Sequence, residues 1–154
     1  MTNYCIGQIE DVPELTQVLK TFYKDSWQNF ADYDDAKMQK WLSEVLMSSN
    51  NGVFLAKEEG KIFAVLIGML DTFPFSNTLI AGDYVWYVLP EKRGGMAGIR
   101  LMKWYEAWAK RMGAVRVMTG ATSGIKTDRA EKLMMRLGYQ AVGGRNMIKE
   151  VSDG

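Results

Sequence analysis

The chain of 154 residues contains no histidine and only one cysteine, Cys5. Without histidine, every catalytic triad that depends on an imidazole base is excluded, and so are most zinc sites, so no metal is expected. One cysteine cannot close an internal disulfide, which agrees with a reducing compartment. Because Cys5 lies in the apolar segment YCIGQI, we interpret it as a buried and unreactive thiol.

An excess of charge is missing as well, since 19 Lys and Arg stand against 18 Asp and Glu and leave a net charge of +1. This balance gives no reason to expect a nucleic acid or an anionic membrane as partner. No apolar run of about 18 residues could span a bilayer, and no basic segment precedes an apolar one at the N-terminus. We therefore expect a cytoplasmic protein with one domain, residues 1–154.

The apolar patterns predict an α/β chain of the α+β type with the element order β-α-α-β-β-β-α-β-α-β. Helices are expected near residues 11–22, 38–46, 98–112 and 128–137, the first with Asp11 as N-cap and Glu14 three residues later. The segment EEG reads as the turn of a hairpin. Strands are expected in NYCIGQIE, VFLAK, KIFAVLIGML, TLIAGDYVWYVL and AVRVMTGA, with a last strand or hairpin in YQAVGGRNMIKEV.

One junction suggests chemistry: the stretch YVLPEKRGGMAGIRLM, residues 87–102, leads from a strand through a glycine-rich turn into a helix. Backbone N–H groups at such a helix start, together with the helix dipole, favour an anion such as phosphate. Gly94 and Gly95 would let a ligand approach the main chain, while Lys92, Arg93 and Arg100 would add positive charge. The turn lacks the Lys-Ser or Lys-Thr ending of a P-loop, and glycine-rich turns of this kind also occur without any ligand.

The segments VLPEKRGGMAG, EAWAKRMGA and DRAEKLMMRLGY, in this order, resemble the GNAT superfamily of N-acetyltransferases. They are most similar to members that phages and prophages carry. The resemblance implies a mixed central sheet of about six to seven strands flanked by about four helices. It also implies acetyl-CoA as co-substrate, wedged where two parallel central strands splay apart.

By the same resemblance, Trp86, Tyr87 and Val88 would hold the pantetheine and the thioester, mainly through backbone groups. The pyrophosphate would lie on the turn into the long helix, formed by Arg93, Gly94, Gly95, Met96, Ala97, Gly98 and Ile99. Thr127 is counted with the cofactor-binding residues because it stands where the family often has an Asn before its fourth helix.

The chain departs from the family pattern at two places. Counted from Arg93, Met96 stands where the first glycine of the pattern belongs, and a side chain there could crowd the pyrophosphate or forbid a positive φ. Counted from Lys92, the small residues fit, but the spacing from the preceding proline shifts by one. Met134 replaces the Tyr that commonly reprotonates the CoA thiolate.

The expected reaction is direct attack of an amine on a thioester, which needs a deprotonated amine and a polarised carbonyl. A backbone N–H near Val88 would polarise the carbonyl. Asp83 is the candidate to accept a proton through water, although a solvent-facing carboxylate is an equally good interpretation. Tyr139, Tyr105 or water could replace the missing Tyr as general acid.

The acceptor is expected near two connections, WQNFADYDD and DTFPFSN, which mix aromatic residues with aspartates and could suit a cationic amine. The alternative is that the aromatics seal the core and the carboxylates cap helices or face solvent.

Three hypotheses follow. The first is an acetyl-CoA-dependent N-acetyltransferase that acts on a small amine or a protein amino group, as a phage accessory enzyme in the host cytoplasm. The second is a GNAT-fold binding protein that has lost catalysis, and the third is a GNAT-like enzyme that modifies nucleic acid, against which the neutral charge counts. A homodimer is compatible with each of them.

Overall fold

A computed structural model describes residues 1–120 and 123–152 of the chain. The chain divides into two compact units, Met1–Thr119 and Gly120–Gly154. The first unit holds one β-sheet and three α-helices, and the second holds the helix α4 (Thr127–Arg136). Among the described residues, no helix is long and apolar enough to cross a membrane.

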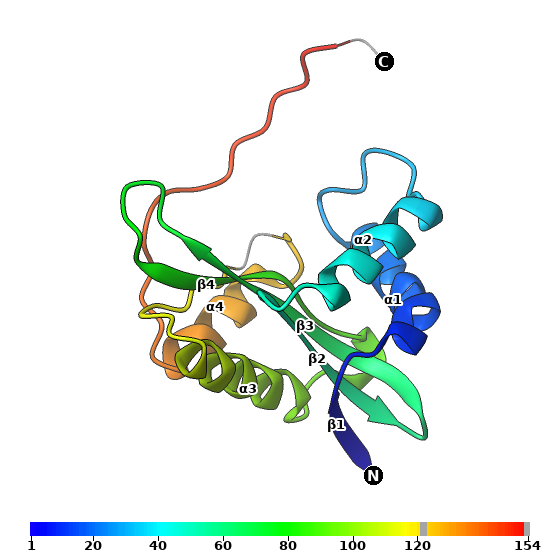
Figure 1. The fold of residues 1–154 in the computed structure, drawn as a ribbon. Coiled ribbons are helices and arrows are strands. Elements are labelled where there is room, and N and C mark those ends of the chain that lie inside the picture. Colours follow the sequence, from blue (N-terminus) through cyan, green and yellow to red (C-terminus); the bar gives the residue numbers. More distant parts are fainter. Residues whose placement is uncertain (121–122, 153–154) are drawn as a thin grey trace. The chain divides into compact units, whose positions relative to one another are not determined.

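The sheet has four antiparallel strands in the order β1-β2-β3-β4 (Figure 1). The expected α/β chain with about four helices is confirmed, whereas the expected six to seven strands are not, because the described residues form four. The central strands are apolar on both faces, and most of their residues are buried. The strands are β1 (Thr2–Ile6), β2 (Asn51–Glu58), β3 (Lys61–Thr72) and β4 (Leu79–Val88).

The hairpin between β2 and β3 turns at Glu59 and Gly60, as the segment EEG predicts. Both residues have positive φ, 51° and 77°. This is the backbone of a two-residue turn that matches the twist of the flanking strands.

Helices cover both faces of the sheet. The helices α1 (Val12–Asp25) and α2 (Asp35–Met47) pack on one side, and α3 (Ala97–Arg111) packs on the other (Figure 1). Their apolar faces recur at helical spacing and bury side chains against the strands. The fully buried core side chains include Leu15, Leu42, Phe54, Leu66, Leu101 and Tyr105.

The start of α1 differs from the expected capping box. Asp11 precedes the helix but makes no side-chain cap; its carboxylate accepts a hydrogen bond from Gln8 N at 2.8 Å and pairs with Lys57 at 2.6 Å. Glu14 accepts a hydrogen bond from Ile62 N at 2.6 Å. Both carboxylates are therefore used to tie α1 to the sheet, because strand groups offer closer partners than the helix's own amides.

Two expected strands do not form among the described residues. The segment AVRVMTGA makes a single parallel bridge, Val117 to Ala81, and its last residue lies outside the described part of the chain. Residues 139–152 contain no strand, and Val142, Met147, Ile148 and Val151 are exposed. A strand needs a partner that buries one of its faces, and no such burial fixes this segment.

Candidate active site

A β-bulge in β4 decides which backbone groups of this strand leave the sheet. Ile67 pairs with Val85, but Gly68 pairs with Asp83, so Tyr84 is an extra residue in β4. An extra residue reverses the alternation of inward and outward backbone groups beyond it. Leu79, Ala81 and Asp83 before the bulge, and Trp86 and Val88 after it, therefore direct their backbone groups away from β3.

In the first half, residues 79–81, the outward groups are paired with the segment 115–118. Val115 N donates to Leu79 O at 3.0 Å, Ala81 N donates to Arg116 O at 2.9 Å, and Met118 N donates to Ala81 O at 2.8 Å. We call residues 79–81 the paired half of β4. It gives the sheet a short parallel extension.

In the second half, residues 83–88, the outward edge is open. Leu89 N donates to Phe63 O at 2.9 Å, so these two residues form a hydrogen-bonded pair of the β3–β4 ladder. Because such pairs alternate, the N–H groups of Trp86 and Val88 point away from β3. Among the described residues, no backbone hydrogen bond joins the segment 115–118 to this open half of β4. In the described part of the chain, the parallel pairing of β4 with the segment 115–118 thus ends at Ala81.

The turn after β4 has the conformation of a ligand-accessible loop. The short 3-10 helix η2 (Pro90–Lys92) is followed by Gly94, whose φ of 93° favours glycine, and α3 begins at Ala97. Met96 has φ −94° and ψ −6°, so its position needs no positive φ, and its side chain is mostly exposed. The conflict expected from a methionine at this position therefore does not arise in the backbone.

A hollow of about 450 Å³ lies beside this turn. Its wall includes Gly95 and Ala97, together with two cations, Lys92 and Arg100. Lys92 is paired with Glu58 at 2.8 Å, and the Arg100 guanidinium lies over the ring of Tyr4, 5.3 Å from its centroid. The other wall residues are Met1, Thr2, Tyr4, Glu58, Phe63 and Met96, so this positive charge faces the side of β1 and β2.

Arg93 does not project from the turn as expected. Its Nε donates to Val88 O at 3.0 Å, and its guanidinium lies 5.4 Å from the centroid of the Tyr87 ring. Arg93 therefore holds the end of β4, and any contact with an anion would come from its remaining N–H groups.

Two of the three predicted pantetheine residues are held by hydrogen bonds of their side chains. Trp86 Nε1 donates to Gly98 O at 3.0 Å, which fixes the first turn of α3 against β4. On the opposite face, Tyr87 Oη donates to Asp25 at 3.1 Å, and burial raises the pKa of Tyr87 to about 12. These two contacts fix the C-terminal part of the open half through its side chains, one on each face of the sheet.

Asp83 lies at the start of the open half. Its cross-strand partner Gly68 faces Tyr105 of α3, so the Asp83 side chain lies on the same face. Burial raises the pKa of Asp83 to about 6, against the opposing effects of its own N–H and the nearby Thr119 hydroxyl. Thr119 Oγ1 is buried and forms no well-shaped hydrogen bond with any described residue. Asp83 is therefore a half-buried carboxylate whose pKa is raised toward neutral pH.

Tyr105, one of the candidate general acids, has another role. Its side chain is fully buried, and its hydroxyl donates to Met118 O at 3.1 Å. The proton is directed at a backbone carbonyl, so this geometry gives no support to Tyr105 as general acid.

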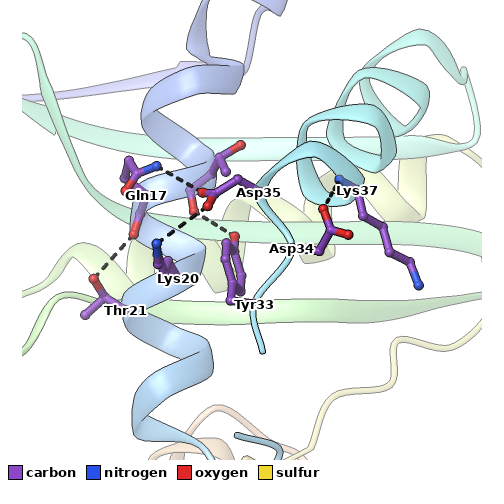
Figure 2. A network of polar contacts seen from close by, with 8 residues as sticks. Gln17, Lys20, Thr21, Tyr33, Asp34, Asp35 and Lys37 are labelled. Carbon is purple, nitrogen blue, oxygen red and sulfur yellow. Dashed lines mark hydrogen bonds and ion pairs between the residues drawn. The ribbon is translucent and has the colours of Figure 1, made fainter. Parts of the chain in front are cut away.

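The carboxylates of the α1–α2 connection mostly serve the fold (Figure 2). Asp34 caps α2 by accepting a hydrogen bond from Lys37 N at 2.9 Å, and Asp35 pairs with Lys20 at 3.5 Å. Tyr33 Oη donates to Thr16 O at 2.7 Å. These contacts match the alternative in which the acidic residues of this connection cap helices.

The aromatic residues of the two connections are not core residues. Trp27, Phe30, Phe73 and Phe75 are all exposed, Phe75 almost completely. The expected sealing of the core by these four rings is therefore wrong.

Three of the residues singled out in the sequence belong to the second unit. Thr127 is the first residue of α4, and Met134 is buried within that unit's helix. Tyr139 follows the helix end, where its N–H donates to Met134 O at 3.0 Å after Gly138 with φ 96°. The first unit alone brings together Asp83, the open half of β4 and the glycine turn.

Comparison with known families agrees with this geometry. The model of the acetyltransferase (GNAT) family matches residues 12–139, and the chain belongs to that family. No curated protein matches the chain significantly in sequence.

Solved structures share the fold at low sequence identity. A predicted acetyltransferase from Clostridium acetobutylicum, solved with acetyl-CoA, has a TM-score of 0.76 and 14% identity, with 97% of this chain and 96% of that chain covered. A ribosomal-protein-alanine N-acetyltransferase from Brucella melitensis has a TM-score of 0.73 and 13% identity, with 97% and 99% covered. An aminoglycoside 6′-N-acetyltransferase from Acinetobacter haemolyticus has a TM-score of 0.73 and 16% identity, with 98% and 99% covered.

Proposed function

We propose that this protein is an N-acetyltransferase that moves the acetyl group of acetyl-CoA to a primary amine by direct attack. The observation that carries the proposal is the open half of β4, whose outward N–H groups lead directly into the glycine turn and the start of α3. An acyl-CoA needs both parts: hydrogen-bond donors along an extended chain and an anion site at its end. Membership of the acetyltransferase (GNAT) family supports the same proposal.

The donor site uses groups that fit acetyl-CoA chemically. The N–H of Val88 is the donor that would polarise the thioester carbonyl, and the helix-start N–H groups with Arg100 and Lys92 would hold the pyrophosphate. Gly94 lets the main chain turn there, and Met96 needs no positive φ, although its exposed side chain forms part of the wall of the hollow.

The reaction assigns one proton step to Asp83. The amine nitrogen attacks the carbonyl carbon, the new C–N bond forms, and the C–S bond breaks to release the CoA thiolate. Asp83, ionised above a pKa of about 6, takes the ammonium proton through water. The thiolate needs little help to leave, and water can return its proton.

The acceptor is proposed to be an amine that enters beside exposed aromatic rings. Asp34 and Asp35 are occupied by a helix cap and an ion pair, and the exposed ring of Phe30 is the proposed contact for the amine. A cationic amine on aromatic faces gains about 0.5–2 kcal/mol.

Calorimetric titration with acetyl-CoA tests the proposal. We expect micromolar binding to the wild type and loss of about tenfold or more in affinity for Arg93→Glu, because the acid would repel the diphosphate and release the end of β4. Arg111→Glu, at the far end of α3, is the matched charge reversal and should bind as the wild type does. Failure of the folded wild type to bind acetyl-CoA would refute the proposed function.

A further inference from the structure

The pairing of β4 with the segment 115–118 stops at one particular missing hydrogen bond. In a parallel ladder, the bonds of Ala81 with Arg116 and Met118 would be followed by one from Asp83 N to Met118 O. That bond is not made within residues 1–120. Both groups have other partners: Met118 O accepts the Tyr105 hydroxyl, and Asp83 N–H lies against its own carboxylate.

The ring of Tyr105 is fixed where it stands. It is fully buried and stacks on Trp108 with 6.2 Å between centroids. It also fills the space left by Gly68, since a Cβ at that position would lie 2.6 Å from the ring. The hydroxyl therefore reaches Met118 from a rigid support on the α3 side of the sheet.

We propose that Tyr105 is a positioning residue that holds the segment 115–118 away from β4 at Asp83 and so keeps the open half of β4 accessible to the donor. A carbonyl oxygen can accept two hydrogen bonds, so the hydroxyl does not act by saturating Met118 O. The Tyr105 hydroxyl acts by orienting the Met118 carbonyl toward α3, so that its oxygen does not point at the Asp83 N–H. The expected effect on acetyl-CoA binding rests on the proposed function. The missing hydrogen bond from Asp83 N to Met118 O does not depend on it.

Amide hydrogen exchange of Asp83, followed by NMR without ligand, tests the positioning. In Tyr105→Phe the ring stays, the donor is lost, and Met118 O is free to pair with Asp83 N–H. We expect the protection of the Asp83 amide to rise about tenfold. Tyr33→Phe is the matched control, because Tyr33 also donates to a backbone carbonyl, that of Thr16, and should leave the Asp83 amide unchanged.

Gly68→Ala provides a second variant should Tyr105→Phe fail to fold. Its methyl group would displace the ring that carries the hydroxyl, so the Asp83 amide should again become more protected. Unchanged Asp83 protection in the variant that folds would overturn the role of Tyr105.

Titration with acetyl-CoA separates this inference from the proposed function. If the hydrogen bond from Asp83 N–H to Met118 O forms in Tyr105→Phe, the affinity for acetyl-CoA should fall about fivefold or more relative to the wild type and to Tyr33→Phe. Equal affinity despite a protected Asp83 amide would overturn the link to the donor site. A wild type that binds no acetyl-CoA would refute the proposed function, and the exchange result would still decide what Tyr105 does.

Discussion

The two halves of β4 belong to one strand and share the same partner, β3, yet they differ in what their outward backbone groups do. In the paired half, Ala81 uses its N–H and its carbonyl to bind the segment 115–118. In the open half, Trp86 and Val88 direct the same groups away from β3. Val88 O accepts a hydrogen bond from Arg93, and within residues 1–120 neither residue makes a backbone hydrogen bond to the segment 115–118. The bulge at Tyr84 and the contact between Tyr105 and Met118 separate the halves. The outward N–H groups of the open half are the ones proposed to bind acetyl-CoA.

Proline substitutions should break this comparison most strongly, because proline removes the N–H of one residue. Ala81→Pro deletes the bond to Arg116 O in a fully buried place, and we expect a loss of about 3 kcal/mol in the free energy of unfolding. Val88→Pro deletes an N–H outside the β3 ladder and should cost only about 1 kcal/mol. It should nevertheless lower kcat about 100-fold, as expected for loss of a carbonyl-polarising donor.

Urea unfolding of both proline variants and steady-state kinetics of Val88→Pro provide these measurements. Equal losses of stability would mean that the Val88 N–H is part of the sheet. The open half would then not be open.

The substitution Asp83→Asn tests the carboxylate that lies between the paired half and the rest of β4. Burial raises the folded-state pKa of Asp83 to about 6, above an unfolded value of about 3.9. The folded chain therefore binds the extra proton between these values, so the stability that Asp83 contributes at low pH is lost as pH rises through about 6. At pH 7.5 the Asn variant should be about 1–2 kcal/mol more stable than the wild type, while turnover falls about tenfold or more.

Unfolding curves across pH 4–8 and the pH profile of kcat/KM check this prediction. The wild-type kcat/KM should rise through about pH 6, and Asp71→Asn, an exposed carboxylate on β3, serves as control. Full turnover in Asp83→Asn would remove Asp83 from the mechanism.

Much of this arrangement follows from the sequence, and one part does not. The apolar periodicity predicts the helices and the first four strands, and the glycines mark the turn before α3. The bulge is different, because TLIAGDYVWYVL is nearly continuous in apolar residues and carries no alternation that could reveal an inserted Tyr84. Which N–H groups leave the sheet is fixed by that one residue, so the functional edge is visible only in the structure.

Arg93 and the acidic connection show the same limit for side chains. A basic residue in a glycine turn predicts an anion contact, but Arg93 finds a nearer acceptor in Val88 O. The aspartates Asp34 and Asp35 predict an acidic rim for a cationic substrate. In the structure, Asp34 caps the start of α2 and Asp35 pairs with Lys20. Sequence identifies the charge, and local geometry decides which partner neutralises it.

The smallest effect is expected at Met96, the residue at which the chain departs from its family's pattern. Met96→Gly should leave acetyl-CoA affinity within about twofold of the wild type, because φ −94° suits any residue and the side chain is exposed. Gly94→Ala is the matched opposite: at φ 93° a Cβ is strained by about 1–2 kcal/mol, and the affinity should fall about tenfold. Tighter binding by Met96→Gly would show that the methionine does obstruct the donor. A glycine at position 96 would then be needed to leave room for the donor. The positive φ that favours glycine is found at Gly94 and not at Met96.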